Sequence, residues 1–190
     1  HSFQFEKLVV GIGGGILARN YLRSISPLVS PWEAERIVIE LLRANTRLLA
    51  FLLKGTPILD EQSLDGLDPR DCPRVLVIGG IKPGRSTDAN TAILAQRIGA
   101  DMFVKMTDVE GVFTADPDSD PNARLIPKAT YEDLLSLSGP TAPGRYGVLD
   151  ELAIRVLQEA RIPAKIIDGR NPRNLLSAIS GEPIGTTIEP

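Results

Sequence analysis

The sequence has very few of the residues that build common metal centres and nucleophilic triads. Histidine occurs once, at His1, and cysteine once, at Cys72. A single histidine argues against a His-based metal centre or a Ser-His-Asp triad. A single cysteine cannot form a disulfide within the chain, and we therefore expect a reducing, cytoplasmic location. Any chemistry must come from other residue types.

Long apolar runs and an excess of basic charge are also missing. We find no run that could span a bilayer and no signal peptide, so no membrane partner is expected. The net charge is −3, which provides no overall basic field for nucleic acid. A bound anion would have to be held by a local cluster. The 190 residues, 43% hydrophobic and 24% charged, are typical of one globular α/β domain.

Apolar runs that end in polar or glycine-rich loops alternate with segments that have helix signals. The expected strands are "KLVVGIGGG", "RVLVIGG", "DMFVKMTD", "AKIIDG" and "GTTIEP". Helices are expected after the first glycine loop, from about Trp32 to Leu53, from about Asp88 to Ile98, and after Thr130, Asp150 and Pro172. Residues 60–74 are expected to form a polar surface loop. This alternation predicts a three-layer α/β/α sandwich with a mostly parallel central sheet.

Two helix starts carry capping signals. Ser30 precedes Pro31, and Glu33 is spaced to close a capping box. Thr130 stands in the same relation to Asp133. The helix that follows Ser30 is apolar on much of its circumference, which predicts a buried helix or a contact between subunits.

Most of the unusual polar residues fall in three loops that follow predicted strands. These loops are Gly13–Gly15, Gly79–Thr87 and Thr107–Asp116. Ligands of parallel α/β sheets bind where loops leave the carboxyl ends of the strands. The three loops are therefore expected to form the functional site.

The first loop, "GIGGGILAR", combines consecutive glycines with Arg19 about one turn into the next helix. Glycines allow backbone N–H groups to approach an anion, and the helix N-terminus adds positive potential. An arginine in that position could bind phosphate oxygens with its forked guanidinium. The alternative is a tight turn that needs glycine for geometry alone.

The second loop, "GGIKPGRSTD", places Lys82, Arg85, Ser86 and Thr87 on one turn. Two cations and two hydroxyls suit a phosphate ester that carries a sugar. The alternative is a solvated loop in which a threonine caps the next helix. Asp88 would repel phosphate unless it orients cations, but it would also complement the macrodipole at the start of a helix.

The third loop, "KMTDVEGVFTADP", carries Lys105 on the strand and Phe113 after a glycine turn. An aromatic ring could pack on a base, and Thr107 or Asp116 could bond to a base or ribose edge. The alternative is a β-turn around Gly111 with an Asp-Pro turn behind it.

The segment "STDANTAILAQRIGADMFVKMTDVEGVFTADPDSDPNARLIPKAT" resembles the nucleotide-binding half of the amino-acid-kinase superfamily, and in particular archaeal uridylate (UMP) kinases. "GGGILARNYL", "LLRANTRLL", "YGVLDELAIRVLQEARIP" and "GEPIGTTIEP" extend the resemblance over nearly the whole chain. It implies transfer of the γ-phosphoryl group of ATP to UMP with Mg²⁺, and a homo-oligomer that is typically a hexamer.

The resemblance also implies roles for individual residues. Asp88 would orient cationic groups around the transferred phosphoryl group, with Arg19 and Lys105 as further catalytic residues. The ATP site would include Gly15, Arg19, Thr107, Asp108, Phe113 and Asp116. The UMP site would include Gly14, Glu35, Ile81, Lys82, Pro83, Gly84, Arg85, Ser86 and Thr87. No metal ligand is assigned to the protein. Residues 1–83 would form mainly the acceptor side and residues 84–190 mainly the ATP side.

Three positions depart from the family pattern. Glu35 stands where an aspartate usually meets the ribose hydroxyl, and Phe113 replaces the usual tyrosine. Gly11 stands where the first strand of the family carries a lysine followed by glycines, so we expect that strand and its helix to be missing. An alternative function is therefore a nucleotide- and oxoanion-binding protein of the same fold, as in molybdenum-storage relatives. A kinase for another small phosphate or carboxylate acceptor is a further alternative.

Overall fold

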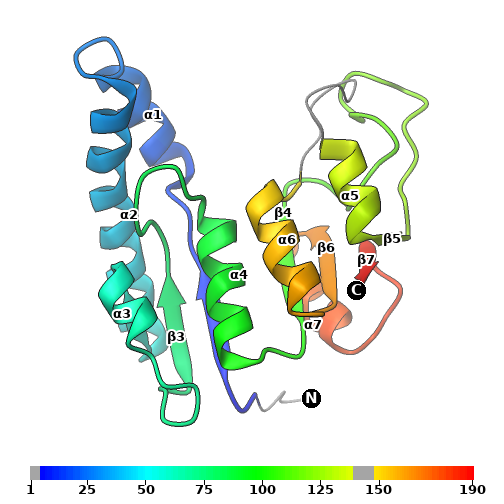
Figure 1. Ribbon diagram of the computed structural model, residues 1–190. Helices are drawn as coiled ribbons and strands as arrows, with labels where there is room; N and C mark the ends of the chain where they lie inside the picture. Colours follow the sequence, from blue (N-terminus) through cyan, green and yellow to red (C-terminus); the bar gives the residue numbers. More distant parts are fainter. Residues whose placement is uncertain (1–4, 139–147) are drawn as a thin grey trace. The chain divides into compact units, whose positions relative to one another are not determined.

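A computed structural model describes residues 5–138 and 148–190 of the chain. The chain divides into two compact units, His1–Ile98 and Gly99–Pro190. Each unit contains one sheet with its own helices (Figure 1). Residues 1–4, and Tyr146 and Gly147 at the start of the "YGVLDEL" motif, lie outside the described residues.

The sheet of the first unit is entirely parallel. Its strands are β1 (Leu8–Gly11), β2 (Thr56–Ile58) and β3 (Val75–Ile78), in the order β1-β3-β2. Its helices are α1 (Gly15–Ile25), α2 (Pro31–Leu53), α3 (Glu61–Asp65) and α4 (Thr87–Ile98). Figure 1 shows α2 on one side of β3 and α4 on the other, so helices cover both faces of this sheet.

The core of this unit lies between the sheet and its helices. β3 is the central strand, and Leu76 and Ile78 point to the same face because side chains alternate along a strand. They form a buried cluster with Ile58 of β2, Leu64 of α3 and Leu94 of α4. The short helix α3 is therefore anchored to the core by one leucine. The prediction that residues 60–74 form only a surface loop was wrong at this helix. The polar composition of the segment gave no apolar periodicity that would indicate a helix.

Helix α2 begins as predicted. The Ser30 hydroxyl accepts from the Glu33 N–H, and the Glu33 carboxylate accepts from the Ser30 N–H at 2.9 Å. Along the helix, Ala34, Ile39 and Ala50 are buried, whereas Phe51 remains 81% exposed. The helix therefore has an apolar side that this chain alone leaves open to solvent.

The sheet of the second unit mixes orientations. Its strands are β4 (Phe103–Thr107), β5 (Lys128–Thr130), β6 (Ala164–Asp168) and β7 (Thr186–Glu189), in the order β4-β6-β7-β5. β4 pairs with β6 and β5 with β7 in parallel, whereas β6 and β7 are antiparallel. The helices are α5 (Tyr131–Ser138), α6 (Glu151–Glu159) and α7 (Arg173–Ile179).

The predicted α/β class with mostly parallel pairing is confirmed. Each predicted strand and helix is present, including Thr130 as the residue that caps α5 and Asp150 as the cap of α6. Strands β2 and β5 were missed because each has only three residues and follows a helix or a proline-bearing loop without an apolar run. Among the described residues, no helix is both long and apolar enough to cross a membrane.

Candidate functional site

The first glycine loop joins β1 to α1. Gly14 is the residue that precedes the helix, and Gly15 has a φ of 58°, a conformation that favours glycine. A Cβ atom on Gly14 would lie 2.1 Å from the Cβ of Ala18 and 2.8 Å from a methyl group of Leu42 on α2. Gly14 is therefore needed for α1 to pack on α2. The predicted alternative, a turn that requires glycine for geometry, applies to this residue whether or not it also meets a ligand.

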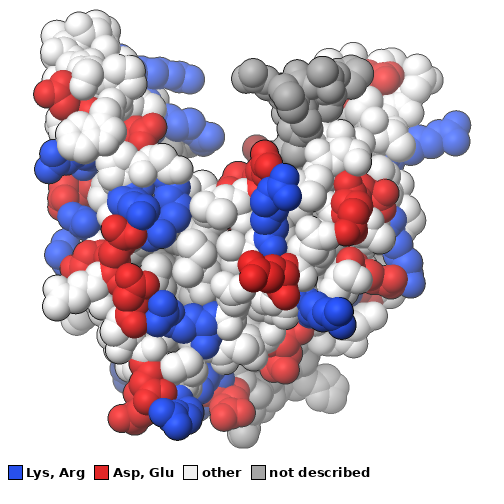
Figure 2. All heavy atoms as spheres, in the orientation of Figure 1, with Lys and Arg blue, Asp and Glu red and all other residues white. Residues whose placement is uncertain are grey.

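Arg19 is exposed on α1. It follows the glycine loop by about one turn, as the sequence predicted. Figure 2 shows that lysine, arginine and acidic side chains are interspersed on the visible surface. An anion on this surface would therefore be held by a local cluster of side chains and not by a field of one sign.

Side chains hold the second loop at two places. On one side, the Gly84 N–H donates to the Glu35 carboxylate on α2 at 2.8 Å. At the start of α4, the Ser86 hydroxyl accepts from the Ala89 N–H at 2.9 Å. Ser86 is therefore the capping residue, whereas the alternative considered for this loop had a threonine as the cap. Thr87 is the first residue of the helix. Gly84 has a φ of 74°, which explains the glycine at the top of the turn.

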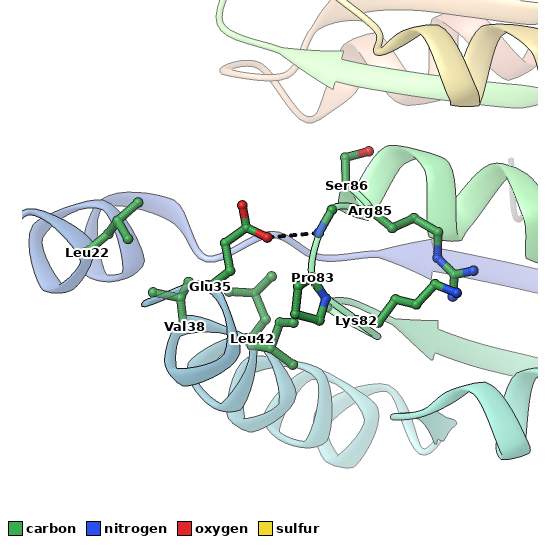
Figure 3. Close-up of a pocket in the computed structure, with 11 residues that line it drawn as sticks. Leu22, Glu35, Val38, Leu42, Lys82, Pro83, Arg85 and Ser86 are labelled. Atoms are coloured by element: carbon green, nitrogen blue, oxygen red, sulfur yellow. Dashed lines mark hydrogen bonds between the residues drawn. The ribbon is translucent and has the colours of Figure 1, made fainter. Parts of the chain in front are cut away.

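A hollow lies between this loop and helices α1 and α2 (Figure 3). Its volume is about 280 Å³, near the lower end for small-molecule sites. Leu22, Val38, Ile39 and Leu42 give it an apolar wall, and the loop gives it a polar rim. Six residues predicted to bind UMP line it together: Glu35, Lys82, Pro83, Gly84, Arg85 and Ser86.

Three other residues of that predicted set have different surroundings. Ile81 is only 3% exposed and belongs to the core cluster. Gly14 contacts α2, and Thr87 opens α4. Among the described residues, these three are not part of the lining of the hollow.

The charged ends of Lys82 and Arg85 meet a carboxylate that was not among the predicted site residues. Lys82 Nζ lies 2.6 Å and Arg85 Nη1 3.6 Å from Glu61 Oε1 at the start of α3. The hydrogen bond from Lys82 is the main reason why the pKa of the Glu61 carboxyl is lowered, with smaller contributions from the charges of Lys82 and Arg85. Glu61 lies in a polar, solvent-exposed segment, so no sequence pattern marked it.

Asp88 lies in the first turn of α4 and is half-buried. An acidic residue there faces the positive end of the helix dipole. The position is compatible both with this electrostatic role and with the predicted orientation of cationic groups at the loop that precedes it.

The third loop starts at the carboxyl end of β4 in the second unit. Thr107 is the last residue of the strand, and its hydroxyl donates to the Asp108 carboxylate at 3.2 Å. Lys105 lies two residues earlier on the same strand and is half-buried. The Gly169 N–H after β6 donates to the Thr107 carbonyl at 2.7 Å. The two strand ends therefore form one short sheet edge.

Phe113 and Asp116 lie in the turn that follows. Phe113 is half-buried and pairs with Leu125 in an isolated antiparallel bridge. One oxygen of Asp116 accepts from the Asp118 N–H at 3.0 Å, which closes a local turn. The Asp-Pro turn of the alternative is therefore present after Asp116, and it leaves the Asp116 carboxylate with further capacity to accept hydrogen bonds.

Two charged residues at the same sheet edge were missed. Asp168, the last residue of β6, is the register partner of Thr107, and its carboxylate binds Arg170 at 2.7 Å. The hydrogen bond from Arg170 lowers the pKa of Asp168. In turn, the bond to Asp168 raises the pKa of Arg170, with smaller contributions from Asp108 and Glu110. A signal was present for Asp168, because the predicted strand "AKIIDG" ends in this aspartate and a glycine, but Arg170 lies beyond that strand.

The predicted residues therefore gather in two groups. The acceptor residues around the hollow, together with Gly15, Arg19 and Asp88, belong to the first unit. Lys105, Thr107, Asp108, Phe113 and Asp116 belong to the second unit. Among the described residues, no group of three His, Cys, Asp or Glu side chains could hold a metal ion.

Comparison with known proteins identifies a family. The family model described as "Amino acid kinase family" matches residues 70–168. A uridylate kinase from Hyperthermus butylicus is 36% identical over 192 residues, which cover 99% of this chain and 84% of the relative. A uridylate kinase from Methanothermobacter thermautotrophicus is 36% identical over 188 residues, 96% of this chain and 84% of the relative.

Solved structures agree. The crystal structure of uridylate kinase from Archaeoglobus fulgidus has a TM-score of 0.78 at 34% identity and covers 96% of this chain and 85% of its own. The UMP kinase from Bacillus anthracis, at 21% identity, has a TM-score of 0.74 over 96% of this chain and 79% of its own, which supports the fold. With a matching family model over half its length and relatives above 30% identity over nearly all of it, the chain belongs to the amino acid kinase family.

Proposed function

We propose that this chain transfers the γ-phosphoryl group of ATP to UMP. The similarity to uridylate kinases runs along nearly the whole chain and carries this proposal. The hollow beside α2 supports it, because residues from two separate parts of the sequence, Glu35 and 82–86, line one cavity of suitable size.

We assign the acceptor nucleotide to this hollow. The apolar wall from α1 and α2 suits a pyrimidine ring, and the polar rim suits a ribose and a phosphate. One carboxylate can accept up to about four hydrogen bonds, so Glu35 can hold the Gly84 N–H and also accept from a ribose hydroxyl. The amides before α1, at Gly14 and Gly15, would face phosphate groups.

We assign the donor nucleotide to the loop after β4. Thr107, Asp108, Phe113 and Asp116 are the predicted contacts, with Gly15 and Arg19 predicted to meet the ATP phosphates. The sheet edge adds Arg170, a cation that could pair with a phosphate oxygen. Mg²⁺ would be carried mainly by the phosphates, since this ion commonly uses only one or two carboxylates of the protein.

Phosphoryl transfer depends mostly on positioning and charge stabilisation, with little covalent work for the protein. Backbone amides, Arg19 and Lys105 would stabilise the negative charge, and Asp88 would orient the cationic groups. This division of labour needs no histidine or cysteine, which matches the composition of the chain.

The proposal extends to assembly and location. We expect a homo-oligomer, with a hexamer as the prediction from the family resemblance. Trp32, Leu48 and Phe51 on α2 are exposed in the isolated chain, and a subunit contact would cover such a surface. A cytoplasmic location remains the expectation from the single cysteine.

Calorimetric titration with UMP, CMP, AMP and GMP tests the acceptor. We expect UMP to bind more tightly than the other three nucleotides. A coupled assay with ATP and Mg²⁺ should then show the same order of preference in turnover. Equal affinities, or no binding of UMP, would contradict the assignment of the acceptor while leaving the family and the fold untouched.

A further inference from the structure

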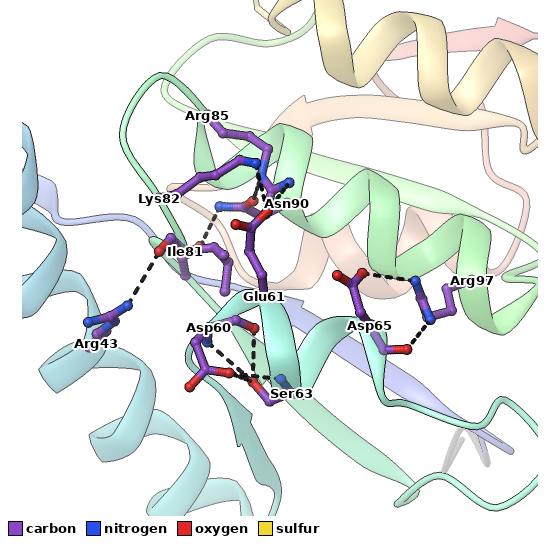
Figure 4. A network of polar contacts seen from close by, with 11 residues as sticks. Arg43, Asp60, Glu61, Ser63, Asp65, Ile81, Lys82, Arg85, Asn90 and Arg97 are labelled. Atoms are coloured by element: carbon purple, nitrogen blue, oxygen red, sulfur yellow. Dashed lines mark hydrogen bonds and ion pairs between the residues drawn. The ribbon is translucent and has the colours of Figure 1, made fainter.

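Carboxylates from two helices, α2 and α3, bind the loop that borders the hollow. Glu35 of α2 accepts from the backbone N–H of Gly84. Glu61 of α3 meets the side chains of Lys82 and Arg85 with a single oxygen, Oε1 (Figure 4). Glu35 has an expected role with the ribose, whereas nothing so far assigns a role to Glu61.

Arg85 is the member of this network that most needs an anion. Its side chain is only 12% exposed, and its Nε donates to the buried Asn90, whose amide nitrogen donates to the Gly79 carbonyl at 2.8 Å. Its Nη2 is the buried side-chain atom that has no hydrogen-bond partner within the described part of the chain. Glu61 is the carboxylate with which Arg85 forms an ion pair. A largely buried cation that loses its counter-ion is strongly disfavoured. Without the Glu61 carboxylate, Arg85 would therefore have to move, and the loop that carries it would shift as well.

Glu61 projects from a well-fixed base. Asp60 caps α3 by accepting from the Ser63 N–H at 2.8 Å, and Leu64 is buried in the core. At the other end of the helix, Asp65 binds Arg97 of α4 at 3.1 Å. The short helix is therefore tied to both the sheet and α4, and its first carboxylate can act as a fixed anchor.

The directions of the side chains agree with an anchor. Figure 3 shows Lys82 and Arg85 extending from the loop away from Glu35, and Figure 4 shows both reaching towards Glu61. Their charged ends are thereby held beside α3, while Pro83 and Gly84 remain at the border of the hollow. The loop therefore contacts a helix on each side, α2 through the Gly84 N–H and α3 through Lys82 and Arg85.

We propose that Glu61 is a positioning residue for the acceptor nucleotide, acting through Lys82 and Arg85 on the loop of residues 79–86. The inference rests on the proposed function for the identity of the ligand. The contacts of Glu61 with Lys82 and Arg85, which we call the clamp, exist whatever the ligand is. Glu61 does not touch the nucleotide in this proposal. It sets the shape of the site that receives it.

The test compares Glu61→Gln with Asp65→Asn. Both substitutions remove one carboxylate charge from α3, but only Glu61 contacts the loop, whereas Asp65 pairs with Arg97. Hydrogen–deuterium exchange of the peptide that covers residues 79–86 reads the clamp directly. We expect faster exchange there in Glu61→Gln, and the unchanged rate in Asp65→Asn.

Calorimetric titration with UMP then measures how the substitutions change the affinity for UMP. We expect Glu61→Gln to bind UMP roughly tenfold more weakly, the scale of coupling within one polar network, and Asp65→Asn to bind normally. In turnover, KM for UMP should rise while kcat changes little. Glu61→Asp keeps the charge and should recover most of the affinity, and it serves as the second variant if Glu61→Gln folds poorly.

The outcomes separate the two proposals. Unchanged exchange of the 79–86 peptide in Glu61→Gln would overturn the inference, whatever the ligand. Equal weakening of UMP binding by Glu61→Gln and Asp65→Asn would also overturn it, because the effect would then come from α3 in general. If the unsubstituted chain binds no UMP but the exchange result is as expected, the clamp stands and the acceptor assignment fails.

Discussion

The role of each carboxylate in this chain depends on the groups within hydrogen-bond distance of its oxygens. Glu33 caps a helix, Glu35 holds a backbone amide at the border of a hollow, and Glu61 pairs with two cations. All three are exposed glutamates in the structure. Their neighbours, and not their type, give each one its role.

Asp88→Asn tests the proposed role of a fourth carboxylate. Asparagine has nearly the same volume, so the fold should persist, and loss of the charge in the first turn of α4 should lower the stability by no more than about 1 kcal/mol. If Asp88 orients cationic groups at the transferred phosphoryl, turnover should fall about a hundredfold or more, the scale of one key electrostatic contact. Steady-state kinetics with UMP and ATP measures this.

Asp101→Asn is the matched control. Asp101 is exposed and precedes β4, at the end of the strand opposite to the third loop. It should leave both turnover and melting unchanged. Near-normal turnover of Asp88→Asn would restrict Asp88 to its electrostatic role at the start of α4.

At the scale of elements, the contact between α1 and α2 depends on a residue without a side chain. Gly14 lies where α1 begins, and a Cβ there would overlap Ala18 on its own helix and Leu42 on α2. A Cβ on the preceding residue, Gly13, would meet no atom of the described chain within 4 Å beyond its immediate neighbours in sequence. Of these two adjacent glycines, packing therefore requires only Gly14 to be glycine.

Gly14→Ala should destabilise the fold by about 1–3 kcal/mol, the usual cost of an extra methyl group in a packed contact. Gly13→Ala should cost much less, because its methyl group has space. Thermal or urea unfolding of the two variants side by side gives the comparison. Equal stabilities would mean that α1 can shift on α2 without cost, and the packing argument would fail.

At the scale of the whole molecule, stability should depend on pH through many carboxylates at once. Hydrogen bonds at helix starts and turns lower the pKa of several carboxyls. The main cause is the bond to Ser30 for Glu33, the bond to Ser63 for Asp60, the bond to Arg70 for Asp68 and the bond to Thr130 for Asp133. A carboxyl whose pKa is lower in the folded state stabilises the fold at pH values above its unfolded pKa. That contribution is lost as the pH falls through the folded pKa.

We therefore expect the melting temperature to change little between pH 7 and about pH 5 and to fall progressively below about pH 5, where the unfolded carboxyls begin to take up protons. Asp60→Asn and Asp133→Asn should reduce the slope of this fall, since each removes one depressed group. Calorimetric melting at a series of pH values is the measurement. A melting temperature that rises towards low pH would have the wrong sign for this explanation.

The local pattern of the sequence determined the elements and the places where ligands are expected. Glycine breaks after apolar runs marked β1 and β3, and the Ser30–Glu33 spacing marked the start of α2, because these signals act between residues close in sequence. The resemblance to uridylate kinases selected the family for the same reason, since it rests on contiguous motifs. The shortest strands, β2 and β5, escaped because three residues show too little periodicity.

Only the tertiary structure decided which distant residues meet. Glu35 and Gly84 are 49 positions apart in the sequence and form a hydrogen bond, and Glu61 reaches Lys82 and Arg85 from a segment that its composition marked as a surface loop. Thr107 and Asp168 become neighbours because β4 and β6 pair in register. Such contacts depend on how helices and strands pack, which short-range pattern does not encode. The polar surroundings of a candidate site, unlike its location at strand ends, therefore become visible only when the chain is folded.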